Sequence, residues 1–211
     1  FDSTGKKLGK SYGNALWLDE NKTSSYEMYQ YILNFEDVMM EEYLKKYTFL
    51  SKEEIEDIMI KHNEAPNLRI AQKVMSEHKE CPEKRMAQKT LAKEIITDLH
   101  GTEEYNKALK ITEALFSGDI ASLSENELKD ALSGVQTETI TEEMNIVDML
   151  VNTKILSSKR EAREFINNGS ISINGEKINT TDMLVNKEKA LYNKYIVVRR
   201  GKKKYYLVIF N

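Results

Sequence analysis

Two lysines near the beginning of the sequence have the spacing of a phosphate-binding loop. Lys7 and Lys10 lie three residues apart, on either side of Gly9 and directly before Ser11. Ammonium groups on such a loop can stabilise the negative charge that develops on phosphate oxygens in a transition state. Basic loops that contain glycine are common, so the motif by itself is a weak indication of an enzyme.

A second group of cationic side chains follows a predicted helix start near the C-terminus. Ser158 and Glu161 have the spacing of a capping box, in which each side chain bonds to the other residue's backbone N–H. They predict a helix at 158–168. Lys159, Arg160 and Arg163 share one face of it, because residues three and four apart are neighbours on a helix. A cationic helix face of this kind predicts contacts with phosphates.

Two hairpins are predicted after this helix. The alternating stretch 171–178 contains Asn174-Gly175, a strong signal for a two-residue turn. The stretch 195–210 indicates a second hairpin, around Gly201. With short helices near 145–153 and 158–168, these hairpins predict a compact α+β module. The hairpin residues that we expect to join this phosphate-binding surface are Asn174, Lys177, Arg199, Arg200, Lys202, Lys203 and Lys204.

The charge distribution is uneven along the chain. The formal net charge is -3, yet residues 145–211 contain 13 Lys and Arg against 6 Asp and Glu. A small basic module therefore follows an acidic one. This division favours a nucleic acid as the partner of the C-terminal part, but a lysine-rich solvated surface accounts for it equally well.

Composition excludes several classes of protein. The single cysteine, Cys81, excludes an internal disulfide and favours a reducing compartment, so we expect a cytoplasmic protein. No apolar run approaches the roughly 20 residues of a membrane span, so we expect no membrane association. His62, His78 and His100 have no partner at metal-ligand spacing, and we therefore expect no structural metal.

Residues 20–133 have the signals of about six short helices. Ser24, Ser51 and Ser124 are each followed three residues later by Glu, which predicts three capping boxes. Pro66 and Pro82 are predicted as first residues of helices. The motif E-x-P-x-x-R-x-A-Q-K occurs twice, at 64–73 and 80–89, and indicates a helical duplication on a solvated helix face, whose role in the domain stays open. The acidic run 134–144 lacks a clear apolar period and is predicted to be a linker.

The C-terminal pattern resembles a known RNA-binding family. Residues 158–175 read S-K-R-E-A-R-x-x-I-x-x-G-x-I-x-x-N-G, which is similar to the domain named after small-subunit ribosomal protein S-four. About a dozen positions match in order. The resemblance implies an RNA-binding surface on the basic helix and the hairpins.

A wider resemblance covers essentially residues 7–211. The stretches KLGKSYGNALWLDENKTSSYEMYQYILN, YLKKYTFLSKEEIE, PEKRMAQKTLA and ALFSGDI look like bacterial-type tyrosyl-tRNA synthetases. The implied fold is α+β: an all-helical anticodon-binding domain, then a small α+β S-four-like RNA-binding domain. The implied organisation is 1–22 as the end of a catalytic domain, 23–133 as the helical domain, 134–144 as the linker and 145–211 as the S-four-like domain.

The resemblance also assigns roles to individual residues. Lys7, Lys10 and Ser11 match a KMSKS-type loop, so they are implied to bind ATP, and the two lysines to act in catalysis. Mg²⁺ enters only with ATP in the full-length enzyme, and no cofactor is expected in this part of it. Glu36-Asp37 follows the first helix, where the family has an acidic residue that reads the first anticodon base. A helix-start charge favoured by the dipole accounts for this pair nearly as well.

The expected partner is tyrosine tRNA, bound through its anticodon stem-loop and its long variable arm. The sequence starts without Met on a loop that would end a catalytic domain, so we expect the C-terminal part of a larger enzyme, which binds tRNA without activating tyrosine. The full-length enzyme is expected to be a homodimer through that absent domain. The alternative is a non-enzymatic ribosome-associated protein with an S-four-like domain. A synthetase for another amino acid, such as tryptophan, is a third possibility.

Overall fold

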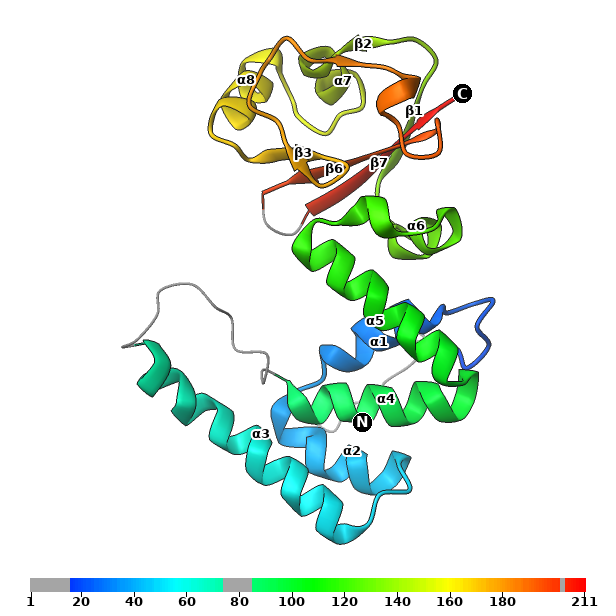
Figure 1. The fold of residues 1–211 in the computed structure, drawn as a ribbon, viewed down its shortest axis with the longest axis vertical. Helices are drawn as coiled ribbons and strands as arrows, with labels where there is room; N and C mark the ends of the chain where they lie inside the picture. Colours follow the sequence, from blue (N-terminus) through cyan, green and yellow to red (C-terminus); the bar gives the residue numbers. More distant parts are fainter. Residues whose placement is uncertain (1–15, 74–84, 202–203) are drawn as a thin grey trace. The chain divides into compact units, whose positions relative to one another are not determined.

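The computed structural model describes residues 16–73, 85–201 and 204–211 of the chain. The fold combines helices with a five-stranded sheet (Figure 1). The chain divides into two compact units, Phe1–Leu109 and Lys110–Asn211. All strands of the described residues lie in the second unit, whereas helices occur in both.

The described part of the first unit is helical. Its elements are α1 (Ser25–Leu33), η2 (Asp37–Met39), α2 (Met40–Tyr47), α3 (Lys52–Lys73), α4 (Met86–His100) and α5 (Thr102–Ser117), the last of which continues into the second unit. Buried side chains of α1, α2 and α4 form one core, which includes Met28, Ile32, Leu44 and Leu91. With α6 in the second unit, the described residues contain the six helices that periodicity predicts for 20–133.

The predicted capping boxes are present at all three serines. At Ser24 and Ser124, the serine hydroxyl accepts a hydrogen bond from the backbone N–H of the glutamate three residues later. The carboxylate of that glutamate accepts a hydrogen bond from the backbone N–H of the serine. At Ser51, the backbone N–H donates to Glu54 Oε2 at 2.8 Å, and the hydroxyl accepts from Glu54 N at 3.2 Å. These contacts span only three residues, so sequence spacing is sufficient to predict them.

The prediction for Pro66 is wrong, because this proline lies inside α3 (Lys52–Lys73) instead of beginning a helix. The sequence signal favoured a helix start because a proline there removes no intrahelical hydrogen bond, whereas inside a helix it does. Pro82 lies outside the described residues. The first copy of the repeat motif ends α3, whereas the described part of the second copy begins α4 at Met86, so the two copies are not equivalent.

The second unit contains a five-stranded sheet with strand order β1-β7-β6-β3-β4 and a separate pair, β2 with β5. The strands are β1 (Thr137–Ile140), β2 (Met144–Asn145), β3 (Ile171–Ile173), β4 (Glu176–Lys177), β5 (Leu184–Val185), β6 (Tyr195–Arg200) and β7 (Lys204–Phe210). Its helices are η3 (Ile120–Ser122), α6 (Glu125–Ala131), α7 (Ile146–Asn152), α8 (Lys159–Asn167) and η4 (Lys187–Lys189). The two helices and two hairpins predicted after residue 144 are confirmed.

Both faces of this sheet are covered. On one face, α7 and α8 pack over Ile196, Val198 and Val208 in a common core (Figure 1). The opposite face carries Tyr195, Val197 and Leu207, which are also buried. The segment 110–133 contributes to that cover, because its backbone and side chains accept hydrogen bonds from tyrosines of the sheet.

The run 134–144 is not the unstructured linker that the sequence predicts, because it contains β1. This strand pairs in parallel with β7, with Thr137 opposite Leu207 and Ile140 opposite Phe210. Four residues are too few to display a clear alternation, and the partner strand lies about 70 residues later in the chain. The pairing is therefore a long-range event that local periodicity does not report.

Candidate nucleic-acid interface

Helix α8 presents the cationic side chains predicted from the sequence. Its buried side is formed by Ala162 and Ile166, both with no exposed surface. Ser158 caps the helix as predicted, accepting a hydrogen bond from Glu161 N at 3.2 Å. The Glu161 carboxylate, however, bonds to the N–H and hydroxyl of Ser157, at 2.8 and 2.6 Å, instead of completing the box with Ser158. These hydrogen bonds lower the pKa of Glu161.

The three cations of α8 are not equivalent. Lys159 Nζ forms an ion pair with Asp148 Oδ1 of α7 at 2.5 Å, so part of its charge is already compensated. Arg160 and Arg163 are exposed and have no ion pair or hydrogen bond with any described residue. Guanidinium groups in this state can donate two parallel hydrogen bonds to a phosphate. The two arginines are therefore the strongest phosphate-binding candidates on this helix.

Arg200 is engaged within the protein. Its Nη1 donates to the Ile155 carbonyl at 2.8 Å, and its guanidinium lies 5.8 Å from the ring centroids of both Phe165 and Tyr206. This contact holds the loop before α8 against β6. Lys204 pairs with Arg200 across the hairpin and lies exposed on the same face of the sheet.

Arg199 lies on the opposite face, since successive residues of a strand point to opposite sides. Its cross-strand partners are Ser172 and Tyr205, and Ser172 in turn is opposite Lys177. Lys177, Ser172, Arg199 and Tyr205 therefore form one row across four strands. The Tyr205 hydroxyl donates to the Leu115 carbonyl near the end of α5, at 2.6 Å. The predicted basic surface is thus divided between two faces of the sheet.

Asn174 has a structural role in the first hairpin. Its side-chain N–H donates to the Lys189 carbonyl at 2.7 Å, and its carbonyl oxygen accepts from Val197 N at 2.8 Å. Both ends of the amide are therefore used within the fold. The other predicted residues, Lys7, Lys10, Ser11, Lys202 and Lys203, lie outside the described residues.

The acidic pair lies directly after α1, as predicted. The Glu36 side chain is exposed, and its carboxylate has no hydrogen-bond or ion-pair partner among the residues that the structure describes. Asp37 is also exposed, but its Oδ1 accepts a hydrogen bond from Gln88 Nε2 at 2.6 Å and lies 3.5 Å from His62 Nε2. Gln88 is completely buried on α4 and His62 is buried on α3.

Sequence reasoning missed both of these supporting residues. Gln88 belongs to the second copy of the repeat, RMAQK, which the sequence predicts to lie on a solvated helix face. Arg85 of that copy also contacts the end of α1, donating to the Leu33 carbonyl. The available signal was a glutamine directly after Ala87 and three positions before Leu91, since both of these apolar residues are buried.

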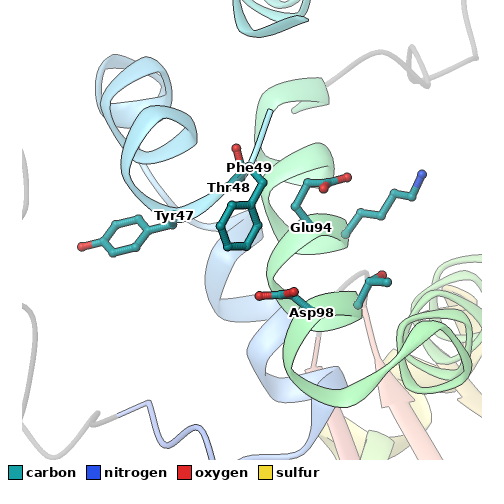
Figure 2. A pocket seen from close by; sticks show the side chains of 7 residues that line it. Tyr47, Thr48, Phe49, Glu94 and Asp98 are labelled. Carbon is teal, nitrogen blue, oxygen red and sulfur yellow. The ribbon is translucent and has the colours of Figure 1, made fainter. Parts of the chain in front are cut away.

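A hollow of about 180 Å³ lies where the end of α2 meets α4 (Figure 2). Tyr47, Thr48 and Phe49 line it from one side, and α4 contributes Glu94 and Asp98. Phe49 is 93% exposed, and Tyr47 is 58% exposed. Lys93 also lines the hollow, but the two carboxylates outnumber its single positive charge and make the hollow a poor site for a phosphate.

The described residues contain no group of three or more His, Cys, Asp or Glu side chains with the arrangement of a metal site. None of the described helices is long and apolar enough to span a membrane.

Two protein-family models match most of the chain. Residues 2–117 match the family described as tRNA synthetases class I (W and Y). Residues 127–208 match the one described as the tyrosine–tRNA ligase SYY-like C-terminal domain.

Curated relatives are similar to almost the whole chain. The tyrosine–tRNA ligases of Streptococcus agalactiae and Streptococcus mutans are 47% and 46% identical over 211 residues, or 99% of this chain. The chain spans 46% and 47% of those proteins, slightly under half of their length. A solution structure of a tyrosyl-tRNA synthetase C-terminal domain is 42% identical over 46% of this chain and 100% of that one, with a TM-score of 0.38.

The match at residues 2–117 covers more than half of the chain, which therefore belongs to the class I tRNA synthetases of the tryptophan and tyrosine group. Within this group it belongs with the tyrosyl enzymes, because the C-terminal match and the curated relatives are all of that kind. This finding argues against the ribosome-associated alternative and against a tryptophan enzyme.

Proposed function

We propose that the chain is the tRNA-binding C-terminal part of a tyrosine–tRNA ligase, which activates tyrosine with ATP and transfers it to tyrosine tRNA. The observation that carries this proposal is the order of the two family matches, a class I synthetase match followed by the C-terminal domain of a tyrosine–tRNA ligase. The finer architecture proposed is an all-helical anticodon-binding domain followed by an S-four-like domain. Such an enzyme acts in the cytoplasm as a homodimer through its catalytic domain.

In the full-length enzyme, the opening loop is proposed to act on ATP. Lys7 and Lys10 have the spacing to approach the phosphates, with Ser11 as an additional ATP contact. Mg²⁺ would accompany ATP. The two ammonium groups would stabilise the charge on the pyrophosphate leaving group as tyrosine attacks the α-phosphate.

The second unit is proposed to hold tRNA through phosphates, at the anticodon stem and the long variable arm. Arg160 and Arg163 support this, because both guanidinium groups are exposed and free of described protein partners. Lys159 on the same helix and Lys204 on the sheet face that α8 covers add positive charge, whereas Lys177 and Arg199 lie on the opposite face. Phosphate contacts position an RNA without reading its sequence. The shape of the tRNA and its 2′-hydroxyl groups would then supply selectivity.

The acidic pair of the first unit is proposed to read the first anticodon base. Tyrosine codons end in a pyrimidine, so the matching anticodon begins with guanosine. The Watson–Crick edge of guanine presents two neighbouring donors, N1–H and N2–H₂, which suit carboxylate acceptors in a single-stranded loop. Glu36 and Asp37 are exposed and lie side by side in sequence, as this contact requires.

The salt dependence of tRNA binding tests the phosphate-binding part of the proposal. For the 211-residue chain and a tyrosine tRNA transcript, we expect the logarithm of affinity to fall linearly with the logarithm of salt concentration. Arg163→Ala should reduce the steepness of that line by about one unit or slightly less. Lys52→Ala is the control, because it removes the same charge from a side chain that is 78% exposed on α3. Equal slopes for wild type and Arg163→Ala would exclude this helix face as the RNA site.

A further inference from the structure

The segment that carries the acidic pair is held in place by one buried side chain. Gln88 has no exposed surface, and its side-chain NH₂ group donates two hydrogen bonds. One goes to the Phe35 carbonyl at 3.1 Å and the other to Asp37 Oδ1 at 2.6 Å. One buried amide therefore bonds to the residues on both sides of Glu36, and Arg85 Nη1 also donates to the Phe35 carbonyl, at 3.5 Å. The Glu36 side chain remains exposed.

This arrangement uses only one oxygen of the Asp37 carboxylate. Gln88 Nε2 and His62 Nε2 both approach Oδ1, at 2.6 and 3.5 Å. The side chain of Asp37 is nevertheless 73% exposed, so Oδ2 remains available to an external donor. A carboxylate that is held at one oxygen and exposed at the other has a defined direction, which a freely rotating surface carboxylate lacks.

The two residues that hold Asp37 also leave buried polar atoms without partners. Among the described residues, three buried side-chain atoms have no hydrogen-bond partner, namely His62 Nδ1, Gln88 Oε1 and Thr97 Oγ1. Two of the three belong to the support of Asp37. An unpaired buried polar atom reduces stability, and each one calls for an explanation. An apolar residue at position 88 would avoid that cost but would not orient the carboxylate.

We propose that Gln88 is a positioning residue for anticodon recognition, which aims the Asp37 carboxylate at the first base. This inference rests on the proposed function, because it deepens the role given there to the acidic pair. Gln88 acts through Asp37 and does not itself touch the RNA, since it is completely buried. His62 assists from α3 at the same oxygen.

The test compares two tyrosine tRNA transcripts that differ only in the first anticodon base, guanosine in one and inosine in the other. Inosine lacks the 2-amino donor, so the ratio of the two affinities measures how well the carboxylates read it. For Gln88→Met, which keeps the length of the side chain but removes the donor, we expect this ratio to fall by about fivefold, the scale of one lost hydrogen bond. Ile96→Val, another buried position on α4, should leave the ratio unchanged.

A double-mutant comparison separates positioning from a general structural effect. In an Asp37→Ala background, Gln88→Met should change the ratio no further, because the group through which Gln88 acts is gone. Gln88→Glu should also lower the ratio, since a second carboxylate would repel Asp37. Thermal unfolding checks that each variant is folded. If either folded Gln88 variant weakened binding of both transcripts in equal proportion, the positioning role would be overturned. Failure of the wild-type chain to bind either transcript would instead overturn the proposed function itself.

Discussion

At the scale of single residues, chemical type does not decide what a side chain does. Arg163 and Arg200 are both arginines of the predicted RNA surface. Arg163 is exposed with no described partner, whereas Arg200 bonds to the Ile155 carbonyl and lies beside two aromatic rings. The side chains of Glu36 and Asp37 differ in the same way, because only the Asp37 carboxylate accepts a hydrogen bond, from Gln88. Residues from distant parts of the chain therefore decide which of these side chains is bonded within the fold and which remains free of described partners.

Glu127 allows a prediction about pH at this scale. It is the Glu of the α6 capping box, and it bonds to Lys110 Nζ at 2.9 and 2.7 Å. Burial raises the pKa of this carboxyl, but the hydrogen bonds from Lys110 and Ser124 outweigh burial and leave the pKa below its usual 4.5. Its contribution to stability is therefore present above about pH 4.5 and is lost as the pH falls through the lower, folded-state pKa.

We expect Glu127→Gln to lower the free energy of unfolding at pH 7 by about 1–2 kcal/mol, because it removes a charge-assisted hydrogen bond and weakens a cap. The difference from wild type should shrink towards zero as the pH is lowered from about 5 to about 3. Urea unfolding of both proteins at several pH values measures this difference in the free energy of unfolding. A difference that stays constant over this range would show that the carboxylate charge does not contribute.

At the scale of elements, one close approach fixes the first hairpin against the end of α5. Gly175 has φ = +93°, and a Cβ at this position would lie 1.8 Å from the Gly118 carbonyl oxygen. Neither backbone can yield easily, because Gly175 is in the turn between β3 and β4 and Gly118 follows directly after α5. Only glycine fits this contact.

Gly175→Ala is therefore expected to destabilise the second unit by about 3 kcal/mol or more, adding a steric clash to the cost of a positive φ. Gly169→Ala is the matched control. Gly169 also has a positive φ, +67°, but no described atom lies within 4 Å of the place that an alanine methyl group would take, so only about 1–2 kcal/mol should be lost. Denaturant unfolding of the two variants gives the comparison. If the two variants lost equal free energy of unfolding, the close contact with Gly118 would not contribute to the cost of Gly175→Ala.

At the scale of the whole molecule, the second unit begins well before the predicted linker. It starts at Lys110, within α5, and includes α6 and β1. Tyrosine hydroxyls connect the sheet to this leading segment, Tyr192 to the Leu123 carbonyl and Tyr195 to Glu125. The acidic run at 134–144 is therefore part of a folded unit.

A truncation series tests this boundary. Residues 110–211 should unfold cooperatively when expressed alone, because they retain β1 and the cover of the second sheet face. Residues 145–211 should not, since their loss of β1 leaves β7 as an edge strand and exposes Tyr195, Val197 and Leu207. Circular dichroism during urea titration distinguishes the two. Cooperative unfolding of residues 145–211 would restore the predicted linker as the true boundary.

The sequence by itself determined the features that depend on near neighbours. The capping boxes at Ser24, Ser51 and Ser124 and the turn at Asn174-Gly175 involve contacts across one to three residues, so their spacing is visible in the sequence. Family membership was also visible, because an ordered set of motifs needs no coordinates. Tertiary structure alone decided the parallel pairing of β1 with β7 and the division of the basic residues between two faces. It also decided the hydrogen bond from Gln88 to Asp37, which lies 51 residues away in the sequence. These contacts join segments distant in sequence, and their free energy comes from burial and hydrogen bonding that exist only once the chain has folded.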